Sequence, residues 1–185
     1  MKLEELIFVT SNLGKLREAN AVLGVSLEHR ALDLPEIQSL DLEEVIHFKV
    51  KMAQERVSRP ILVEDTSLEL PGMGGFPGPL IRWLLASVGA EGICRLAAAF
   101  EDRRARVRCG ACAASGSEEI LGMGIVEGEI ARRPRGTRGF GWDSVFIPEN
   151  GGGKTYAELN TAEKNRISHR RKALEDLKKS LAFPG

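Results

Sequence analysis

The sequence is short of net charge, of cysteine and of long apolar runs. Lys plus Arg and Asp plus Glu each number 26, so the formal net charge is zero. Because a protein that binds DNA or RNA is usually basic overall, no nucleic-acid partner is expected. The apolar run at residues 6–9 is far too short to span a bilayer, so no membrane partner is expected either.

Three cysteines, an odd number, do not suggest a disulfide framework. Cys109 and Cys112 make a C-x-x-C pair, but no second pair supports a zinc site, and we interpret both as ordinary strand residues. The first residues of the chain lack the apolar core of a signal peptide. Together these features predict a soluble protein of a reducing, cytoplasmic compartment.

A length of 185 residues fits one domain, and we expect residues 1–185 to form a single domain of two lobes. Segments with helical spacing separate the first β-rich runs, which predicts parallel pairing of the early strands. Ser115-Gly116-Ser117 lies between two strand-like runs and indicates a hairpin. The expected fold is α/β: a mixed, elongated central β-sheet flanked by helices, with a cleft between the two lobes.

The predicted strands cover residues 6–10, 26–31, 61–65, 104–114, 118–127 and 143–147, and the predicted helices cover residues 15–23, 41–57, 80–87, 92–100 and 162–181. Residues 71–79 hold four glycines and three prolines and are predicted to form a loop. Asp41 is expected to cap the second helix, with Glu44 completing a capping box, and Thr161 is expected to cap the last helix.

The motif Thr10-Ser11-Asn12-Leu13-Gly14-Lys15 lies where a strand turns into a helix. A helix N-terminus offers free N–H groups to a phosphate, and here Thr10 and Asn12 add short polar groups while Lys15 adds a full charge. The motif is not a Walker A loop, because Val9 stands where that loop needs a glycine. A plain capped turn would look the same, so both interpretations stay open.

Three charged residues indicate a metal and phosphate site. Lys49 falls inside the apolar stripe of the 41–57 helix, so it either extends to the surface or meets an anion. Asp65 ends a predicted buried strand, where open α/β sheets place their chemistry, and Glu36 lies in a loop. Two carboxylates from separate segments could hold one Mg²⁺. Each acid alone could also be a turn or cap residue, and Glu44 is a lower-ranked rival ligand.

Phe140-Gly141-Trp142-Asp143 could recognise a base. Phe140 and Trp142 offer flat faces, Gly141 lets the backbone approach a ligand, and Asp143 could accept hydrogen bonds from a base edge. The same residues could instead anchor a loop through aromatic packing.

The last predicted helix carries an inward-facing cation. By helical angle, Arg170 points into the apolar face and therefore needs a carboxylate, a phosphate or a base carbonyl. Lys164 and Ser168 flank that face. His169 falls off the apolar face, so we interpret it as a ligand contact rather than a core histidine.

These motifs, in this order, resemble the inosine triphosphate pyrophosphatases, also called dITP/XTP or non-canonical purine NTP pyrophosphatases. The matching segments span residues 7 to about 180 and are Thr10–Lys15, Leu34–Gln38, Val63–Thr66, Gly74–Pro79, Phe140–Asp143 and Ser168–Arg170. The resemblance implies hydrolysis of ITP, dITP or XTP to the nucleoside monophosphate and pyrophosphate, which keeps deaminated purines out of DNA and RNA. It also implies a Mg²⁺ cofactor, a purine nucleoside triphosphate substrate and a homodimer.

The resemblance also implies a role for each matching residue. Glu36 and Asp65 are the implied metal ligands, and Asp65 and Lys15 are the implied catalytic residues. The implied substrate contacts are Thr10, Ser11, Asn12, Lys15, Lys49, Thr66, Arg82, Phe140, Gly141, Trp142, Asp143, Lys164, His169 and Arg170.

The chain departs from the family pattern at a few positions. Ser11 replaces a usual glycine, Ser67 stands where many bacterial members have glycine, Arg82 where some have lysine and Ser144 where proline is common. None of these changes removes a carboxylate or a cation. A pyrophosphatase for modified pyrimidine nucleotides and a nucleotide-binding regulator without turnover are the alternatives, and an assay of products would separate them.

Overall fold

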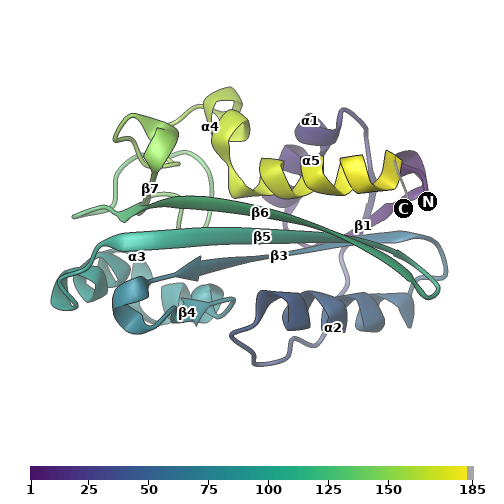
Figure 1. Ribbon diagram of the computed structural model, residues 1–185, viewed down its shortest axis with the longest axis horizontal. Helices are drawn as coiled ribbons and strands as arrows, with labels where there is room; N and C mark the ends of the chain where they lie inside the picture. The colour runs from purple at the N-terminus through teal and green to yellow at the C-terminus, as the bar shows by residue number, and fades with distance from the viewer. Residues whose placement is uncertain (183–185) are drawn as a thin grey trace. The chain divides into compact units, whose positions relative to one another are not determined.

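The protein has an α/β fold, described here by a computed structural model that places residues 1–182 (Figure 1). Within these residues a mixed seven-stranded sheet has the order β2-β1-β3-β5-β6-β7, with β4 paired to β3. The strands are β1 (Ile7–Val9), β2 (Glu28–Arg30), β3 (Ile61–Glu69), β4 (Pro77–Gly78), β5 (Arg104–Ser115), β6 (Glu118–Ile130) and β7 (Phe146–Pro148). The helices are α1 (Leu13–Leu23), α2 (Leu42–Gln54), α3 (Ile81–Ala99), α4 (Thr161–Ile167) and α5 (His169–Ala182).

The strand directions confirm the predicted mixed sheet. β1 pairs in parallel with both β2 and β3, and α1 and α2 make the crossovers between these strands. β5 and β6 are neighbours joined by the two residues Gly116 and Ser117, and so short a connection can only join antiparallel strands. β4 pairs antiparallel with β3, and β7 with β6.

The chain divides into two compact units. Unit 1 comprises Met1–Asp65, Cys109–Gly124 and the chain from Arg170 onward, and unit 2 comprises Thr66–Arg108 and Ile125–His169. Each unit has apolar clusters of its own, as described below. The single two-lobed domain and its cleft stay predictions.

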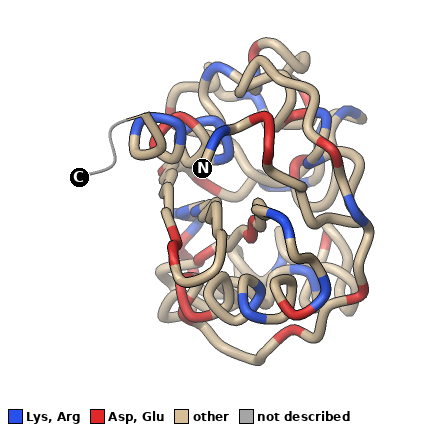
Figure 2. The backbone as a smooth tube through the Cα atoms, turned by 90° about the vertical axis from the view of Figure 1, so that its right-hand side faces the viewer, with Lys and Arg blue, Asp and Glu red and all other residues tan. Residues whose placement is uncertain are grey.

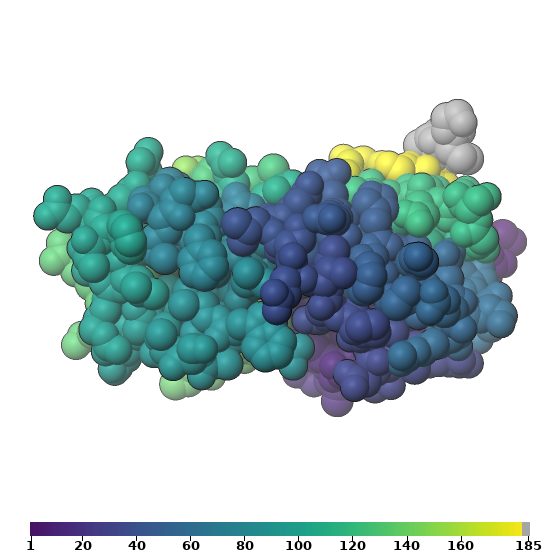
Figure 3. Space-filling model, turned by 90° about the horizontal axis from the view of Figure 1, so that it is seen from below, coloured from purple at the N-terminus to yellow at the C-terminus, as the bar shows by residue number. Residues whose placement is uncertain are grey.

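Unit 1 packs helices on both faces of its strands. On β1, Phe8 faces a cluster with α1 and α5, whereas its neighbours Ile7 and Val9 face a cluster with α2, because successive strand residues point to opposite sides (Figure 1). The predicted apolar stripe of Leu42, Val45, Ile46, Ala53 and Val57 is buried, and Val50 is buried with it. Figure 3 shows α2 at the surface of this unit beside the turn between β5 and β6, where Gln54 Nε2 donates to the Gly116 carbonyl at 2.9 Å.

Unit 2 has a separate core between its strand segments and α3. Its fully buried members include Leu68 of β3, Ile93 of α3, Val107 of β5, and Phe146 and Tyr156. Helix α3 is interrupted at Gly89, whose φ of 68° and ψ of 177° are not helical. This interruption separates the two helices that the sequence predicts for the segment.

The final helix is not continuous, which corrects the prediction for residues 162–181. Ser168 is extended, with φ −74° and ψ 151°, so α4 ends before it and α5 begins after it. The cap of α4 is Asn160, whose side chain accepts from the backbone N–H of Glu163, and Thr161 is the first helical residue. Residues 162–181 contain neither Gly nor Pro, so local propensity gave no sign of this break.

Other boundaries also differ from the predictions. The strand predicted from residue 143 begins only at Phe146, and residues 77–78 of the predicted loop form β4. Asp41 caps α2 as predicted, by accepting from the Glu43 N–H, but Glu44 does not close a capping box and accepts instead from the Ser39 hydroxyl.

The charged residues are mixed along the chain, and the cysteines are buried and unpaired. Lys and Arg are interspersed with Asp and Glu along the backbone (Figure 2), and their equal numbers give the zero net charge. Cys94, Cys109 and Cys112 are free and buried, and the last two lie on β5 as predicted. Burial raises the pKa of the Cys112 thiol to about 12. Among the placed residues, every helix is too short or too polar to cross a bilayer.

Gly122→Ala should destabilise the protein, because β6 and α5 approach each other closely at this glycine. A Cβ atom there would lie 2.3 Å from the Ala173 carbonyl oxygen and 2.4 Å from the Leu177 nitrogen, both backbone atoms that cannot move independently. We expect a loss of about 1–3 kcal/mol in the free energy of unfolding, measured by urea denaturation. Glu118→Ala, on the exposed start of the same strand, is the control and should change stability little. If Gly122→Ala leaves the free energy of unfolding unchanged, α5 can move away from β6 without loss of stability.

Candidate functional site

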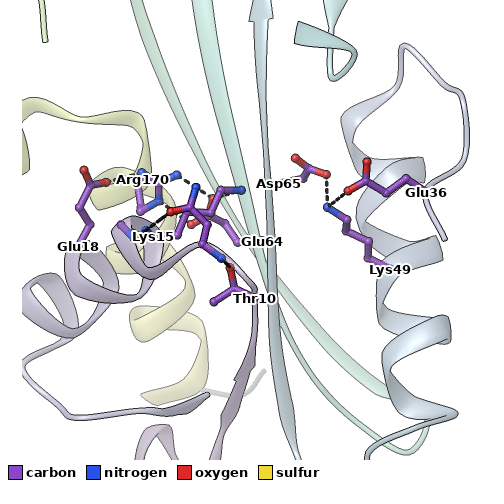
Figure 4. Close-up of polar contacts among 10 residues, drawn as sticks. Thr10, Lys15, Glu18, Glu36, Lys49, Glu64, Asp65 and Arg170 are labelled. Carbon is purple, nitrogen blue, oxygen red and sulfur yellow. Dashed lines mark hydrogen bonds and ion pairs between the residues drawn. The ribbon is translucent and has the colours of Figure 1, made fainter. Parts of the chain in front are cut away.

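Two consecutive acids on β3 point to opposite faces of the sheet in unit 1. Glu64 faces α1 and α5, and Asp65 faces α2 (Figure 4). Each acid meets cations that other elements supply. The strand therefore carries two separate charge clusters back to back.

The Asp65 cluster contains both predicted metal ligands and one lysine. The Lys49 ammonium lies 2.6 Å from Asp65 Oδ2 and 3.1 Å from Glu36 Oε1, so one cation bridges two carboxylates that are 29 positions apart in the chain. Burial lowers the pKa of Lys49, but the attraction of Asp65 and Glu36 outweighs it and raises that pKa above its ordinary value. The structure thus brings Glu36 and Asp65 together as the sequence predicts, and it adds Lys49 between them.

The geometry of this cluster fits a magnesium ion. Mg²⁺ is usually held by one or two carboxylates, with water and substrate phosphates completing its shell. Glu36 and Asp65 already hold a cation between them, and their side chains are 34% and 16% exposed, so a ligand can reach them. Among residues 1–182 no group of three or more His, Cys, Asp or Glu side chains could enclose a metal by itself. Water and phosphate oxygens would therefore have to supply the other ligands.

The Glu64 cluster is a buried ion-pair network. Arg170 Nε and Nη2 donate to the two oxygens of Glu64 at 2.6 and 2.9 Å, which is a bidentate pair. Arg170 Nη1 also donates to Glu18, and the Lys15 ammonium lies 3.1 Å from Glu64 Oε1. The Glu64 side chain is fully buried, and although burial raises its pKa, Arg170 and Lys15 hold that pKa well below its ordinary value.

Sequence reasoning missed Glu64 and Glu18. The inward angle of Arg170 correctly indicated a need for an anionic partner, but it did not identify one. Lys15 lies on the Glu64 side of β3, away from the Glu36–Asp65 pair (Figure 4). The structure therefore places Lys15 in the second cluster, whereas the sequence analysis groups it with the metal ligands.

The motif at the start of α1 forms a well-capped turn. Asn12 Oδ1 accepts from the N–H groups of Gly14 and Lys15 at 2.8 and 3.2 Å, and Thr10 Oγ1 accepts from the Asn12 N–H at 3.1 Å. Ser11 is exposed at the tip of the turn. The structure thus shows the capped turn, and phosphate binding by these residues stays a prediction.

The predicted base-binding loop of unit 2 is organised around Asp143. Asp143 Oδ2 accepts from the Phe140 N–H at 2.9 Å and from the Lys164 ammonium at 2.7 Å. The ammonium also lies 4.8 Å from the Phe140 ring centroid. Gly139 is required here, because a Cβ atom would lie 2.1 Å from Asp143 Oδ2. Phe140, Asp143 and Lys164 therefore form one preorganised group.

His169 is a buried residue, which corrects the expectation that it lies off the apolar face. It is 2% exposed, and its ring centroid lies 5.3 Å from that of Trp142 and 5.8 Å from that of Tyr156. The expectation assumed that one regular helix continues through Ser168, but the chain leaves the helical conformation at that residue. Trp142 is also buried, in the unit 2 core, so the aromatic anchor left open by the sequence is what the structure shows.

The remaining candidates have less definite surroundings. Thr66 is half-buried on β3 directly after Asp65, and Gly141 has a φ of 62°, which favours glycine. The Arg82 guanidinium lies 5.6 Å from the ring centroid of Trp83, itself 60% exposed. The structure itself gives neither Thr66 nor Arg82 a role.

Together, the strand-to-helix turn, the paired acids and their bridging lysine define an α/β protein with a candidate site for a metal-bound, phosphate-bearing ligand. Comparison with known proteins assigns the chain to a family. The sequence profile of the Ham1 family matches residues 6–180, and the chain belongs to that family.

Its relatives include named enzymes and solved structures. An inosine triphosphate pyrophosphatase of Pyricularia oryzae is 49% identical over 92% of this chain and 89% of its own, and one of Tuber melanosporum is 45% identical over 95% of both. The Staphylococcus aureus Ham1 protein superposes with a TM-score of 0.80 at 25% identity, covering 97% of this chain and 99% of its own. A dITP/XTP pyrophosphatase of Mycobacterium abscessus gives a TM-score of 0.67 at 26% identity over 97% and 99% of the two chains.

Glu64→Gln should weaken the fold and change its response to acid. The amide keeps the shape but removes the charge that compensates Arg170 in the interior, and we expect a loss of about 3–5 kcal/mol at pH 7. Because the folded pKa of Glu64 lies below its ordinary 4.5, its charge stabilises the fold fully above that pH. This stabilisation is lost as the pH falls from there through the folded pKa, so the variant should lose less stability than the wild type in that range.

Urea denaturation at pH 7 and at a series of values below pH 4.5 measures both effects. The control is Glu4→Gln, at an exposed position of the same unit. Equal stability of the Glu64 variant and the wild type at pH 7 would show that the buried network contributes nothing to the fold.

Proposed function

We propose that this chain is a nucleoside-triphosphate pyrophosphatase that converts ITP, dITP and XTP into the nucleoside monophosphate and pyrophosphate. The observation that carries the proposal is the pair Glu36 and Asp65 holding one cation. Two further findings support the proposal: the chain belongs to the Ham1 family, and it is similar to proteins named inosine triphosphate and dITP/XTP pyrophosphatases. Removing such nucleotides would keep deaminated purines out of DNA and RNA.

The proposed chemistry centres on Asp65. Glu36 and Asp65 would hold Mg²⁺, which when bound supplies positive charge to the phosphate oxygens. Asp65 also orients and deprotonates the attacking water, as a general base must lie within hydrogen-bond reach of the proton it takes. Lys49, already on Asp65, turns its ammonium to a phosphate oxygen, since charge neutralisation is the main need of phosphoryl transfer.

The triphosphate contacts are proposed on the first turn of α1. Thr10, Ser11 and Asn12 would approach the phosphates, and Lys15 would neutralise part of their charge. In the structure Lys15 is paired with Glu64 but is still 17% exposed. It can therefore share its ammonium between Glu64 and a phosphate.

The base contacts are proposed on the resemblance and on the preorganised loop of unit 2. Thr66, Arg82 and Gly141 are assigned to the substrate without a specified part of it. The residues assigned to the base and phosphates are Phe140, Trp142, Asp143, Lys164, His169 and Arg170. Hypoxanthine and xanthine carry a carbonyl at the 6-position, and a donor from His169 or a backbone N–H would pair with it. Adenine would present an amino donor to the same group, and an unpaired buried donor costs about 1–3 kcal/mol.

A homodimer and a cytoplasmic location complete the proposal. The homodimer is implied by the family resemblance, and the location by the composition.

The test of function is an assay with Mg²⁺ and ITP, dITP, XTP, ATP, GTP or UTP that detects pyrophosphate separately from phosphate. We expect the first three to react best and pyrophosphate to be the primary product. A preference for ATP or UTP, or release of phosphate as the first product, would reject the proposal.

Asp65→Asn should lower kcat for ITP by about 10²–10⁴-fold, because the amide cannot take a proton from water. The fold should persist, since Lys49 keeps its contact with Glu36. Steady-state kinetics and circular dichroism measure the two quantities. Asp33→Asn, an exposed acid of the segment that carries Glu36, is the matched control and should retain activity. Full activity of the Asp65 variant would remove it from the role of base.

Glu36→Gln should raise the Mg²⁺ concentration needed for half-maximal activity by about tenfold or more, because a metal ligand loses its charge. Titration of the protein with Mn²⁺, followed by electron paramagnetic resonance, should show the same weakening without turnover. Glu44→Gln is the control, since Glu44 is held by Ser39 and shows no contact with Lys49 or Asp65 among the placed residues. If metal binding is weaker in the Glu44 variant and unchanged in the Glu36 variant, Glu44 rather than Glu36 is the metal ligand.

A further inference from the structure

Unit 2 contains a surface hollow whose lining is strongly cationic. The hollow has a volume of about 220 Å³ and lies between the second half of α3 and the segment that follows β6. Four arginines line it: Arg95, Arg103, Arg132 and Arg133. None of the residues proposed above for substrate or metal lies among its lining residues.

The arginines come from three segments that fold onto one place. On α3, Glu91, Cys94 and Arg95 share one helix face, because residues three and four apart lie side by side. Arg103 lies just before β5, and its Nη1 donates to the carbonyls of Ile130 and Ala131 at 3.3 and 3.0 Å. These bonds fix Arg103 against the end of β6, next to Arg132 and Arg133.

The positive charge of the hollow is only weakly compensated. Glu91 is the single acid of the lining, and it lies 3.9 Å from Arg95 with 80% of its side chain exposed. An exposed pair of this kind contributes little. Within residues 1–182, no carboxylate forms an ion pair with Arg103, Arg132 or Arg133. Three guanidinium groups thus gather in one hollow without a protein counter-charge, although like charges repel.

The chemistry of the lining specifies its ligand. Guanidinium is planar, always charged and suited to bidentate contact with phosphate oxygens. A hollow lined by one sign of charge also concentrates the opposite ion. Pockets for drug-sized ligands measure roughly 300–1,000 Å³, so this smaller hollow suits a small ion. We propose that the hollow is a second anion site, which binds a small phosphate oxyanion, either orthophosphate or pyrophosphate.

The site is separate from the proposed catalytic chemistry, so its test does not depend on turnover. The probes are orthophosphate and pyrophosphate added without metal to the full-length ¹⁵N-labelled chain, followed by amide chemical shifts at low ionic strength. Saturable shifts should appear at residues 94–95, 103 and 132–133. Raising the salt concentration should weaken the binding, because exposed charges are screened.

Two double variants test whether the arginines of the hollow, rather than surface charge in general, bind the anion. Arg132→Gln with Arg133→Gln should weaken binding at these amides by about tenfold or more, because two charge-assisted contacts are lost. Arg104→Gln with Arg106→Gln removes the same charge from β5 of the same unit, where both arginines pair with acids, and should change the affinity less than about twofold. Arg133→Gln alone should give an intermediate loss. Because Arg132 and Arg133 are exposed, ITP hydrolysis without added anion should be unchanged in their variant.

The proposal is overturned if the shifts do not saturate, or if both double variants lose affinity equally, since the latter result would mean general surface charge. A short single-stranded DNA serves as the last probe. If it shifts these amides while phosphate and pyrophosphate do not, the hollow binds a nucleic-acid backbone and the proposal of a small-anion site is wrong.

Discussion

The alternation of side chains along β3 is the constraint on which both charge clusters depend. Glu64 and Asp65 are consecutive, so a pleated strand must send them to opposite faces. One face then needs cations from α1 and α5, and the other needs a cation from α2. Asp65 remains partly exposed beside Glu36, whereas Glu64 is sealed beneath Lys15 and Arg170. The same strand thus supplies one partly exposed carboxylate and one fully buried carboxylate, and the difference between them is their burial.

The features that the sequence predicted well are those that local pattern determines. Helical spacing located α2 and its buried stripe, the alternation of strands and helices predicted the parallel half of the sheet, and a short polar stretch marked the β5–β6 hairpin. Asp65, Glu36 and Lys49 were each identifiable as charged residues in unusual places. The pairing of Glu36 with Asp65 was predicted, but the bridging of both carboxylates by the Lys49 ammonium was not, because that contact follows from packing rather than from spacing.

The features that the sequence missed have physical causes of the same kind. Good helix formers fill residues 162–181, so nothing local indicates that Ser168 is extended. The prediction assumed one continuous helix through Ser168. On that assumption Arg170 points inward, which is right, and His169 points outward, which is wrong. The break allows adjacent residues both to be buried, His169 among aromatic rings of unit 2 and Arg170 among acids of unit 1. Residues 143–145 resembled the start of a strand because a tightly packed turn can bury side chains as a strand does.

The Glu64 network also limits how this sequence can diverge. Lys15 and Arg170 balance Glu18 and Glu64, so the four side chains together carry no net charge. Replacing one of them leaves an odd charge in a largely buried cluster, whereas exchanging a cation and an anion together for apolar residues of similar volume can preserve neutrality. Accepted changes at these positions should therefore occur as coupled pairs. Aligned relatives would show this as correlated variation between the first turns of α1, the middle of β3 and the beginning of α5.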